Sequence, residues 1–211
     1  MRLPRSPRRP KEIKQEAPDK LRVPPGQFAT EKFPVLTYGP TPRIDLKEWR
    51  FRIFGLVAEE KVLAWEEFMA LPKVALTADF HCVTQWSRLS NHWEGISSRE
   101  VVGLVRPLPE ARFVMVHCYG GYTTNLPMEV FLVENVLFAY RHDGQDLAPE
   151  HGGPMRLVVP ERYGWKSAKW VRGVELMAQD APGFWEQRGY NMSGDPWREE
   201  RFWPGLGEGY D

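Results

Sequence analysis

Proline limits how this chain can fold more than any other residue, because it occurs 19 times among the 211 residues. Its ring fixes φ and removes a backbone donor, so it favours turns and sheet edges over long helices. Nine tryptophans accompany it, and a bulky ring with a single donor suits pocket walls and irregular surfaces. We therefore expect a loop-rich α+β or β-dominated domain rather than a helical bundle.

Short stretches of the chain carry the patterns of strands and helices. Apolar and charged residues alternate from Trp49, which places Trp49, Phe51 and Ile53 on one face and predicts a strand with one buried side. Further strands are predicted over 74–81, 112–118, 136–140, 155–160 and 171–177. Short helices are predicted over 64–71, 97–105 and 127–134. A Ser97–Glu100 capping box opens the second helix, and Pro127 opens the third.

Composition divides the chain into three parts around one folded domain. Residues 1–30 are rich in Pro, Arg and Lys and have no apolar period. They indicate either a disordered or surface-wrapped tail, or a basic arm that docks on an acidic partner. Residues 31–178 carry the strand and helix patterns. Residues 179–211 are aromatic and rich in Gly and Pro, so we expect them to pack across the domain.

Charge and hydropathy exclude several classes of protein. The 28 acidic and 28 basic residues balance, which gives no basis for nucleic-acid binding. No stretch approaches the roughly 20 apolar residues that a membrane-spanning helix needs. Arg8-Arg9 is not followed by the apolar segment of an export signal, so we expect a cytoplasmic protein. Two cysteines in that compartment are more often free thiols or ligands than a disulfide.

Cys82 lies at the end of the strand predicted over 74–81, where a polar loop is expected to begin. Strand ends and loops hold functional groups more often than strand centres do, although a lone cysteine is commonly just a small buried apolar residue. Two His-Cys pairs, 81–82 and 117–118, suggest zinc as an alternative. Zinc is the weaker hypothesis, because adjacent side chains on a strand point to opposite faces and the usual short ligand spacings are missing.

A second group of candidate residues lies in segments 151–156 and 163–170. These segments combine glycines, cations, a serine and flat aromatic rings, which suit a planar heterocycle that carries a phosphate. The alternative is a solvated basic loop beside core aromatics. A third segment, 119–127, contains a Gly-Gly turn before the helix start. The sequence contains no nucleotide-binding glycine motif and no Gly-x-Ser-x-Gly.

Taken in order, these segments resemble the sulfite-oxidase superfamily of molybdopterin enzymes, above all its short stand-alone bacterial members. A more distant similarity is to the catalytic subunit of the periplasmic methionine sulfoxide reductase. The matching signatures are Cys82-Val83 with Trp86-Ser87, then 121–127, then 154–160 with 163–171. The resemblance implies a single α+β domain, with mixed β-sheets and short helices, that holds molybdenum on one pyranopterin dithiolene.

The resemblance also implies roles for particular residues. The thiolate that ligates molybdenum falls on Cys82, and a soft thiolate suits a metal that two dithiolene sulfurs already hold. Arg88 and His81 flank the thiolate in sequence, and we expect them to complete the catalytic set by steering an oxyanion substrate. Contacts with the cofactor fall on Tyr38, Gly39, His117, Cys118, His151, Arg156, Lys166, Ser167, Ala168 and Lys169.

The expected function is a molybdopterin-dependent oxidoreductase that couples oxygen-atom transfer to electron transfer on a small oxo-acid or an S- or N-oxide. The chain is too short for the additional domains of eukaryotic sulfite oxidases, which implies a separate redox partner protein with haem or flavin. Thr84 stands where the methionine-sulfoxide-reductase branch has an acidic residue, which weakens the case for that substrate. Two alternatives stay open: a molybdopterin-binding or carrier protein without turnover, and an interaction domain that kept the fold and lost the metal.

Overall fold

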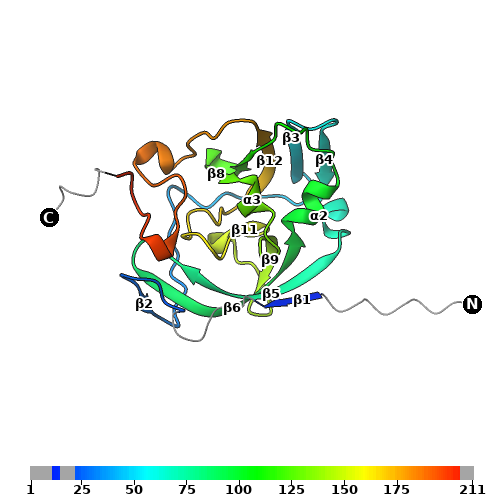
Figure 1. Ribbon diagram of the computed structural model, residues 1–211. Helices are drawn as coiled ribbons and strands as arrows, with labels where there is room; N and C mark the ends of the chain where they lie inside the picture. The colour runs from blue at the N-terminus through cyan, green and yellow to red at the C-terminus, as the bar shows by residue number, and fades with distance from the viewer. Residues whose placement is uncertain (1–10, 15–21, 205–211) are drawn as a thin grey trace, which may run out of the picture.

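Two mixed β-sheets organise the residues that the computed structural model describes, 11–14 and 22–204 (Figure 1). The path of the first sheet is β1 (Lys11–Lys14), β5 (Lys73–His81), β6 (Trp86–Ser97), β9 (Leu137–His142) and β10 (Gln145–Asp146). Two further strands join it, β11 (Arg156–Val158) on β9 and β2 (Phe28–Ala29) on β6. The order of the second sheet is β4 (Lys61–Ala64), β3 (Arg50–Gly55), β12 (Val171–Met177), β7 (Phe113–Cys118) and β8 (Thr123–Pro127).

The α+β class is confirmed, because both sheets combine parallel and antiparallel pairs with short helices between strands. The alternation from Trp49 is confirmed as well, since Trp49, Phe51 and Ile53 are fully buried. The other predicted strands correspond to β5, β7, β9, β11 and β12. The helices α1 (Trp65–Met69), α2 (Ser98–Gly103) and α3 (Met128–Phe131) lie where helices are predicted but are shorter. None of the described helices is long and apolar enough to cross a membrane.

Two elements differ from the sequence prediction. The polar loop expected after Cys82 is only a tight turn, and the chain returns at once as β6, paired antiparallel with β5. Strand β6 was not predicted, because polar residues interrupt its apolar pattern. Ser87 and Asn91 are nevertheless buried, and each has a hydrogen-bond partner. Residues 123–127 form β8 rather than a helix entry, so α3 begins only at Met128.

One core fills the space between the sheets. The ring of Phe51 on β3 lies 5.0 Å from that of Phe138 on β9, so aromatic packing joins the second sheet to the first. Phe68 of α1 packs on the same Phe51 ring at 4.7 Å. A second apolar cluster includes Trp93, Phe80 and Cys82. Cys82 is thus placed by a packed hairpin and not by a mobile loop.

Both ends of the described chain lie against this framework. Strand β1 pairs parallel with β5, and β2 pairs parallel with β6 beside the turn that carries Cys82. Between them, Arg22 forms an ion pair with buried Asp79 of β5. The rest of the predicted N-terminal arm, residues 1–10 and 15–21, lies outside the described residues. At the other end, the last described residues cross the domain to the same turn, where Arg201 donates to the carbonyl of Val83.

Candidate functional site

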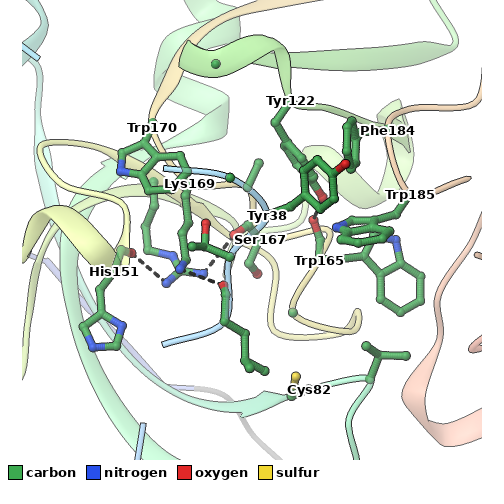
Figure 2. Close-up of a pocket in the computed structure, with 18 of the residues that line it drawn as sticks. Tyr38, Cys82, Tyr122, His151, Trp165, Ser167, Lys169, Trp170, Phe184 and Trp185 are labelled. Carbon is green, nitrogen blue, oxygen red and sulfur yellow. Dashed lines mark hydrogen bonds between the residues drawn. The ribbon is translucent and has the colours of Figure 1, made fainter. Parts of the chain in front are cut away.

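A cavity of about 620 Å³ lies beside the turn between β5 and β6 (Figure 2). Segments far apart in the sequence line it: 33–42, 80–86, 119–122, 151–156, 164–170 and 184–190. Figure 2 shows His151, Lys169 and Trp170 on one side and Phe184 and Trp185 on the other. A volume of this size is typical of sites for small molecules and cofactors.

Cys82 contributes its thiol to this lining from the first position of the tight turn. The backbone N–H of Gln85 and the side-chain amide of Gln27 both donate to the Cys82 carbonyl, at 3.2 and 3.0 Å. The thiol lies 3.1 Å from the hydroxyl of Thr84. Burial raises the pKa of the Cys82 thiol, so a metal or another cation is needed to hold it as a thiolate.

A cationic side of the cavity is built on β11 and the loop that follows it. The guanidinium of Arg156, which is buried, donates to the carbonyls of His151 and Ser167, each at 2.9 Å. It also lies 5.3 Å from the centre of the Phe80 ring. Burial lowers the pKa of Arg156 to about 10, which still leaves it charged near neutral pH. Arg156 therefore brings a positive charge to the cavity and fixes the two loops beside it.

Lys169 supplies the second charge on the cationic side. Its ammonium donates to the carbonyls of Leu36 and Glu150, at 2.9 and 2.7 Å. An ammonium has three donors, so one N–H is left for an anion in the cavity. Burial lowers the pKa of Lys169, repulsion from Arg156 lowers it further, and the resulting value is about 8. An anionic ligand is expected to hold this ammonium in its charged form.

The other side of the cavity is an aromatic wall, made of Tyr38, Phe184, Trp185 and Tyr190. The ring of Phe184 lies 5.1 Å from that of Tyr38, and the ring of Trp185 lies 4.9 Å from that of Tyr190. Three of these residues belong to the C-terminal segment, for which the sequence leaves open whether it closes the pocket or makes a subunit contact, and in which no site residue is predicted. The density of aromatic residues after Gln179 is the signal that points to them.

Lys166 does not face the cavity, although it was predicted to contact the cofactor. It is fully buried, and its ammonium lies 2.6 Å from a carboxylate oxygen of Glu186, which is also fully buried. Its other two donors bond to the backbone and side-chain oxygens of Asn125, at 3.0 and 2.7 Å. Glu186 also accepts from Nε1 of Trp165 at 2.9 Å. Lys166 therefore holds the C-terminal segment in place, which is a structural task.

The residues predicted to flank the thiolate also lie outside the cavity lining. His81 is buried beside the Ser87 hydroxyl at 2.9 Å, and burial lowers the pKa of His81 to about 4. Arg88 is paired with Asp143 at 2.5 Å and donates to Asn91. Neither side chain is part of the cavity lining, so the geometry gives no support for a role in steering an oxyanion.

His117 and Cys118, which were predicted to contact the cofactor from the end of β7, also lie outside the cavity lining. His117 pairs with Glu175 of the neighbouring strand at 2.9 Å, and Cys118 is part of the main core. Tyr119 and Gly120, the next residues, line the cavity in their place. Zinc finds no support here, since the described residues bring together no group of three or more His, Cys, Asp or Glu side chains.

The remaining predicted site residues come together. Tyr38, Gly39, His151, Arg156, Ser167, Ala168 and Lys169 line the cavity with Cys82. Ser167 accepts from the backbone N–H of Val159 at 2.9 Å, which keeps its side chain in a fixed position.

The family model described as "Oxidoreductase molybdopterin binding domain" matches residues 38–185. The chain belongs to this family. It is a molybdopterin-dependent oxidoreductase of the sulfite-oxidase-like kind, and its cofactor is molybdenum bound to molybdopterin. This confirms the expected family, fold and cofactor.

Individual relatives give the same picture. The uncharacterized oxidoreductase YuiH of Bacillus subtilis is 46% identical over 182 residues, or 86% of this chain and 92% of YuiH. A sulfite oxidase of Arabidopsis thaliana is 27% identical over 74% of this chain, but the match covers only 49% of that protein. The structure of the sulfane dehydrogenase SoxCD of Paracoccus pantotrophus matches with a TM-score of 0.61. At 23% identity, over 66% of this chain and 40% of that chain, SoxCD shows the fold alone.

The side chains around the cavity fit this cofactor. Cys82 offers a soft donor for molybdenum. Arg156 and Lys169 offer two positive charges for a phosphate, and Ser167 adds a hydroxyl beside them. Gly152, which has a φ of 108°, lets the backbone come close to Lys169, where a Cβ would meet the Lys169 Cα at 3.1 Å.

Gly164 offers a test of how tightly the cavity floor is packed. A Cβ at this position would lie 2.6 Å from two carbons of the Phe80 ring, which itself supports Arg156. Gly164→Ala is expected to lower the free energy of unfolding by about 1–3 kcal/mol, because the ring must shift in a packed core. Urea denaturation measures this change. Gly103→Ala is the control, since nothing lies near its Cβ position, and equal effects of the two substitutions would contradict the argument.

Proposed function

We propose that this oxidoreductase transfers an oxygen atom to or from a small oxo-acid or an S- or N-oxide, at molybdenum ligated by Cys82. The observation that carries the proposal is the position of the Cys82 thiol. It lies in the cavity lining together with the cationic side and the aromatic wall (Figure 2). A thiol in that position can bind a metal whose organic ligand is held by the cations.

In this proposal, different residues bind the metal, bind the phosphate and line the rest of the cavity. Cys82 would hold the metal, and the turn that carries Cys82 is fixed by a hydrogen bond from Gln27 to the Cys82 carbonyl. Arg156 and Lys169 would bind the phosphate, and the Ser167 hydroxyl would donate to it. The aromatic wall would present flat apolar rings on the other side of the cavity. When bound, the cofactor supplies two-electron redox chemistry at molybdenum.

Electrons enter or leave through a second protein in this proposal. Reduction of an S- or N-oxide breaks the bond between oxygen and sulfur or nitrogen, consumes two electrons and two protons, and releases the oxygen as water. Oxidation of an oxo-acid takes its oxygen from water and releases two electrons and two protons. The electrons are exchanged with a separate haem or flavin protein.

The metal content of two cysteine variants tests the proposal. Protein from a host that makes molybdopterin and is fed molybdate is expected to hold about one molybdenum per chain. Cys82→Ala is expected to lower that content by about tenfold or more, because a lost ligand costs at least as much as a lost second-shell partner. Elemental analysis of the purified protein measures it.

Cys118→Ala is the matched control, because Cys118 is a buried thiol in the main core and outside the cavity lining. It is expected to keep its molybdenum. Equal metal content in Cys82→Ala and the wild type would reject Cys82 as the ligand. A metal-loaded wild type that turns over neither oxides with a reduced dye nor sulfite with ferricyanide would reject the proposed reaction.

A further inference from the structure

The positive charges of the cavity lining are gathered on one side. Its cations are Arg156 and Lys169, with His151 beside them, and every lining residue lies in the described part of the chain. Figure 2 separates His151 and Lys169 from Phe184 and Trp185 on the opposite side. A phosphate pairs with cations, so Arg156 and Lys169 would hold the phosphate of the cofactor and their charges would be taken up by it.

The aromatic wall has a different character. Phe184 meets Tyr38 and Tyr122 at ring distances of 5.1 and 5.6 Å, and Trp185 meets Tyr190 at 4.9 Å. Arg188 lies over the Phe184 ring but is not part of the cavity lining. An anion placed against this wall would lose part of its hydration and would gain no cation from the cavity lining in return.

The wall is fixed before any ligand arrives. Glu186 lies directly after Trp185 in sequence and is held by Lys166, Trp165 and Thr124, at 2.6, 2.9 and 3.1 Å. Its buried carboxylate therefore fixes the chain that carries Phe184 and Trp185 just before it. Preformed aromatic surfaces bind flat or apolar groups with little loss of conformational freedom.

We infer that the substrate is an uncharged S- or N-oxide with an aromatic or apolar substituent, which packs against Phe184 and Trp185 while its oxygen faces the side of Cys82. This inference rests on the proposed function and chooses between the substrate classes that it leaves open. In the reaction the S–O or N–O bond breaks, two electrons come from a reduced haem or flavin protein, and two protons convert the oxygen into water.

The test compares matched neutral and anionic compounds on molybdenum-loaded protein. KM values for dimethyl sulfoxide, methyl phenyl sulfoxide, pyridine N-oxide and nitrate are measured with reduced methyl viologen, and that for sulfite with ferricyanide. Dissociation constants of the same compounds are measured by tryptophan fluorescence of the oxidised protein. The aryl sulfoxide is expected to have a KM and a Kd about tenfold or more below those of dimethyl sulfoxide, since a ring is stabilised by stacking.

Variants of the wall separate its role from that of the metal. Phe184→Ala and Trp185→Ala are expected to raise the KM and Kd of the aryl sulfoxide about tenfold, and those of dimethyl sulfoxide less than about twofold. Trp185→Phe should restore most of the loss. Trp203→Ala is the control, since it removes an exposed ring of the same segment that does not line the cavity.

The outcomes separate the inference from the proposed function. Binding of nitrate or sulfite as tight as that of the aryl sulfoxide would overturn the inference, and so would wall variants that bind the aryl sulfoxide normally. A loaded protein that turns over none of the compounds would reject the proposed reaction. The fluorescence titration would still decide whether the wall binds uncharged aryl oxides.

Discussion

Glu186→Ala is expected to lower the free energy of unfolding by about 3–5 kcal/mol, because it leaves the buried ammonium of Lys166 without its counter-charge. Burial already lowers the pKa of Lys166, and Glu186 opposes that shift. Without the carboxylate, the lysine either stays charged at high cost or loses its proton. Trp165 and Thr124 lose an acceptor at the same time. Urea denaturation of the purified variant measures the change.

Two comparisons make this result specific. Glu60→Ala removes the carboxylate of an exposed ion pair with Arg52. It is expected to lower the free energy of unfolding by less than about 1 kcal/mol. The double variant Lys166→Met/Glu186→Met is expected to recover much of the loss, because replacing both buried charges with apolar side chains removes the desolvation penalty. If Glu186→Ala cost no more than Glu60→Ala, the buried pair would not be what fixes the C-terminal segment.

Arg156→Met is expected to reduce both stability and cofactor content. The guanidinium makes two hydrogen bonds to loop carbonyls, and hydrogen bonds to charged groups contribute about 1.5–3 kcal/mol each. We expect a loss of about 3 kcal/mol in the free energy of unfolding of the cofactor-free protein. Molybdenum and pterin content are expected to fall by about tenfold or more, since a phosphate charge loses its partner and both loops lose their support. Elemental analysis and urea denaturation report the two effects separately.

Arg156→Lys distinguishes geometry from charge. A lysine keeps the positive charge but cannot reach two carbonyls with a planar fork. If the cofactor content of Arg156→Lys falls almost as far as that of Arg156→Met, the planar guanidinium and its two hydrogen bonds are needed as well as the charge. Full cofactor content in Arg156→Lys would show that charge alone is needed, and would contradict the idea that Arg156 organises the loops of His151 and Ser167.

Much of the fold was readable from local patterns. The alternation of Trp49, Phe51 and Ile53 gave β3, and continuous apolar runs gave β5, β7 and β12 close to their observed bounds. Strand β6 was not predicted, because buried polar residues such as Asn91 interrupt the apolar pattern expected of a buried strand. Asn91 bonds to Ala78 of β5 and to His142 of β9, and a single sequence does not show which polar groups will find such partners in the interior.

Only some residues of the candidate site could be predicted from the sequence, for a related reason. Cys82, Arg156 and Lys169 follow from the motifs of the family, and they line one cavity. Lys166 lies in the same motif but turns the other way, toward Glu186. Its partner is 20 residues later in a segment without regular periodicity. Long-range pairing of this kind depends on how the C-terminal segment crosses the domain, which local patterns do not encode.

The similarity to the family extends over residues 38–185, yet the site relies on residues on both sides of those limits. Gln27 holds the carbonyl of Cys82, and Glu186 stands directly after the last matched position. A fragment cut at residues 38 and 185 would keep the thiol and the cations but lose Gln27, which holds the Cys82 carbonyl, and Glu186, which fixes the aromatic wall. The working unit is therefore longer than the segment that the family model matches. Experiments that shorten this domain or graft it onto another protein need to carry residues 22–204 together.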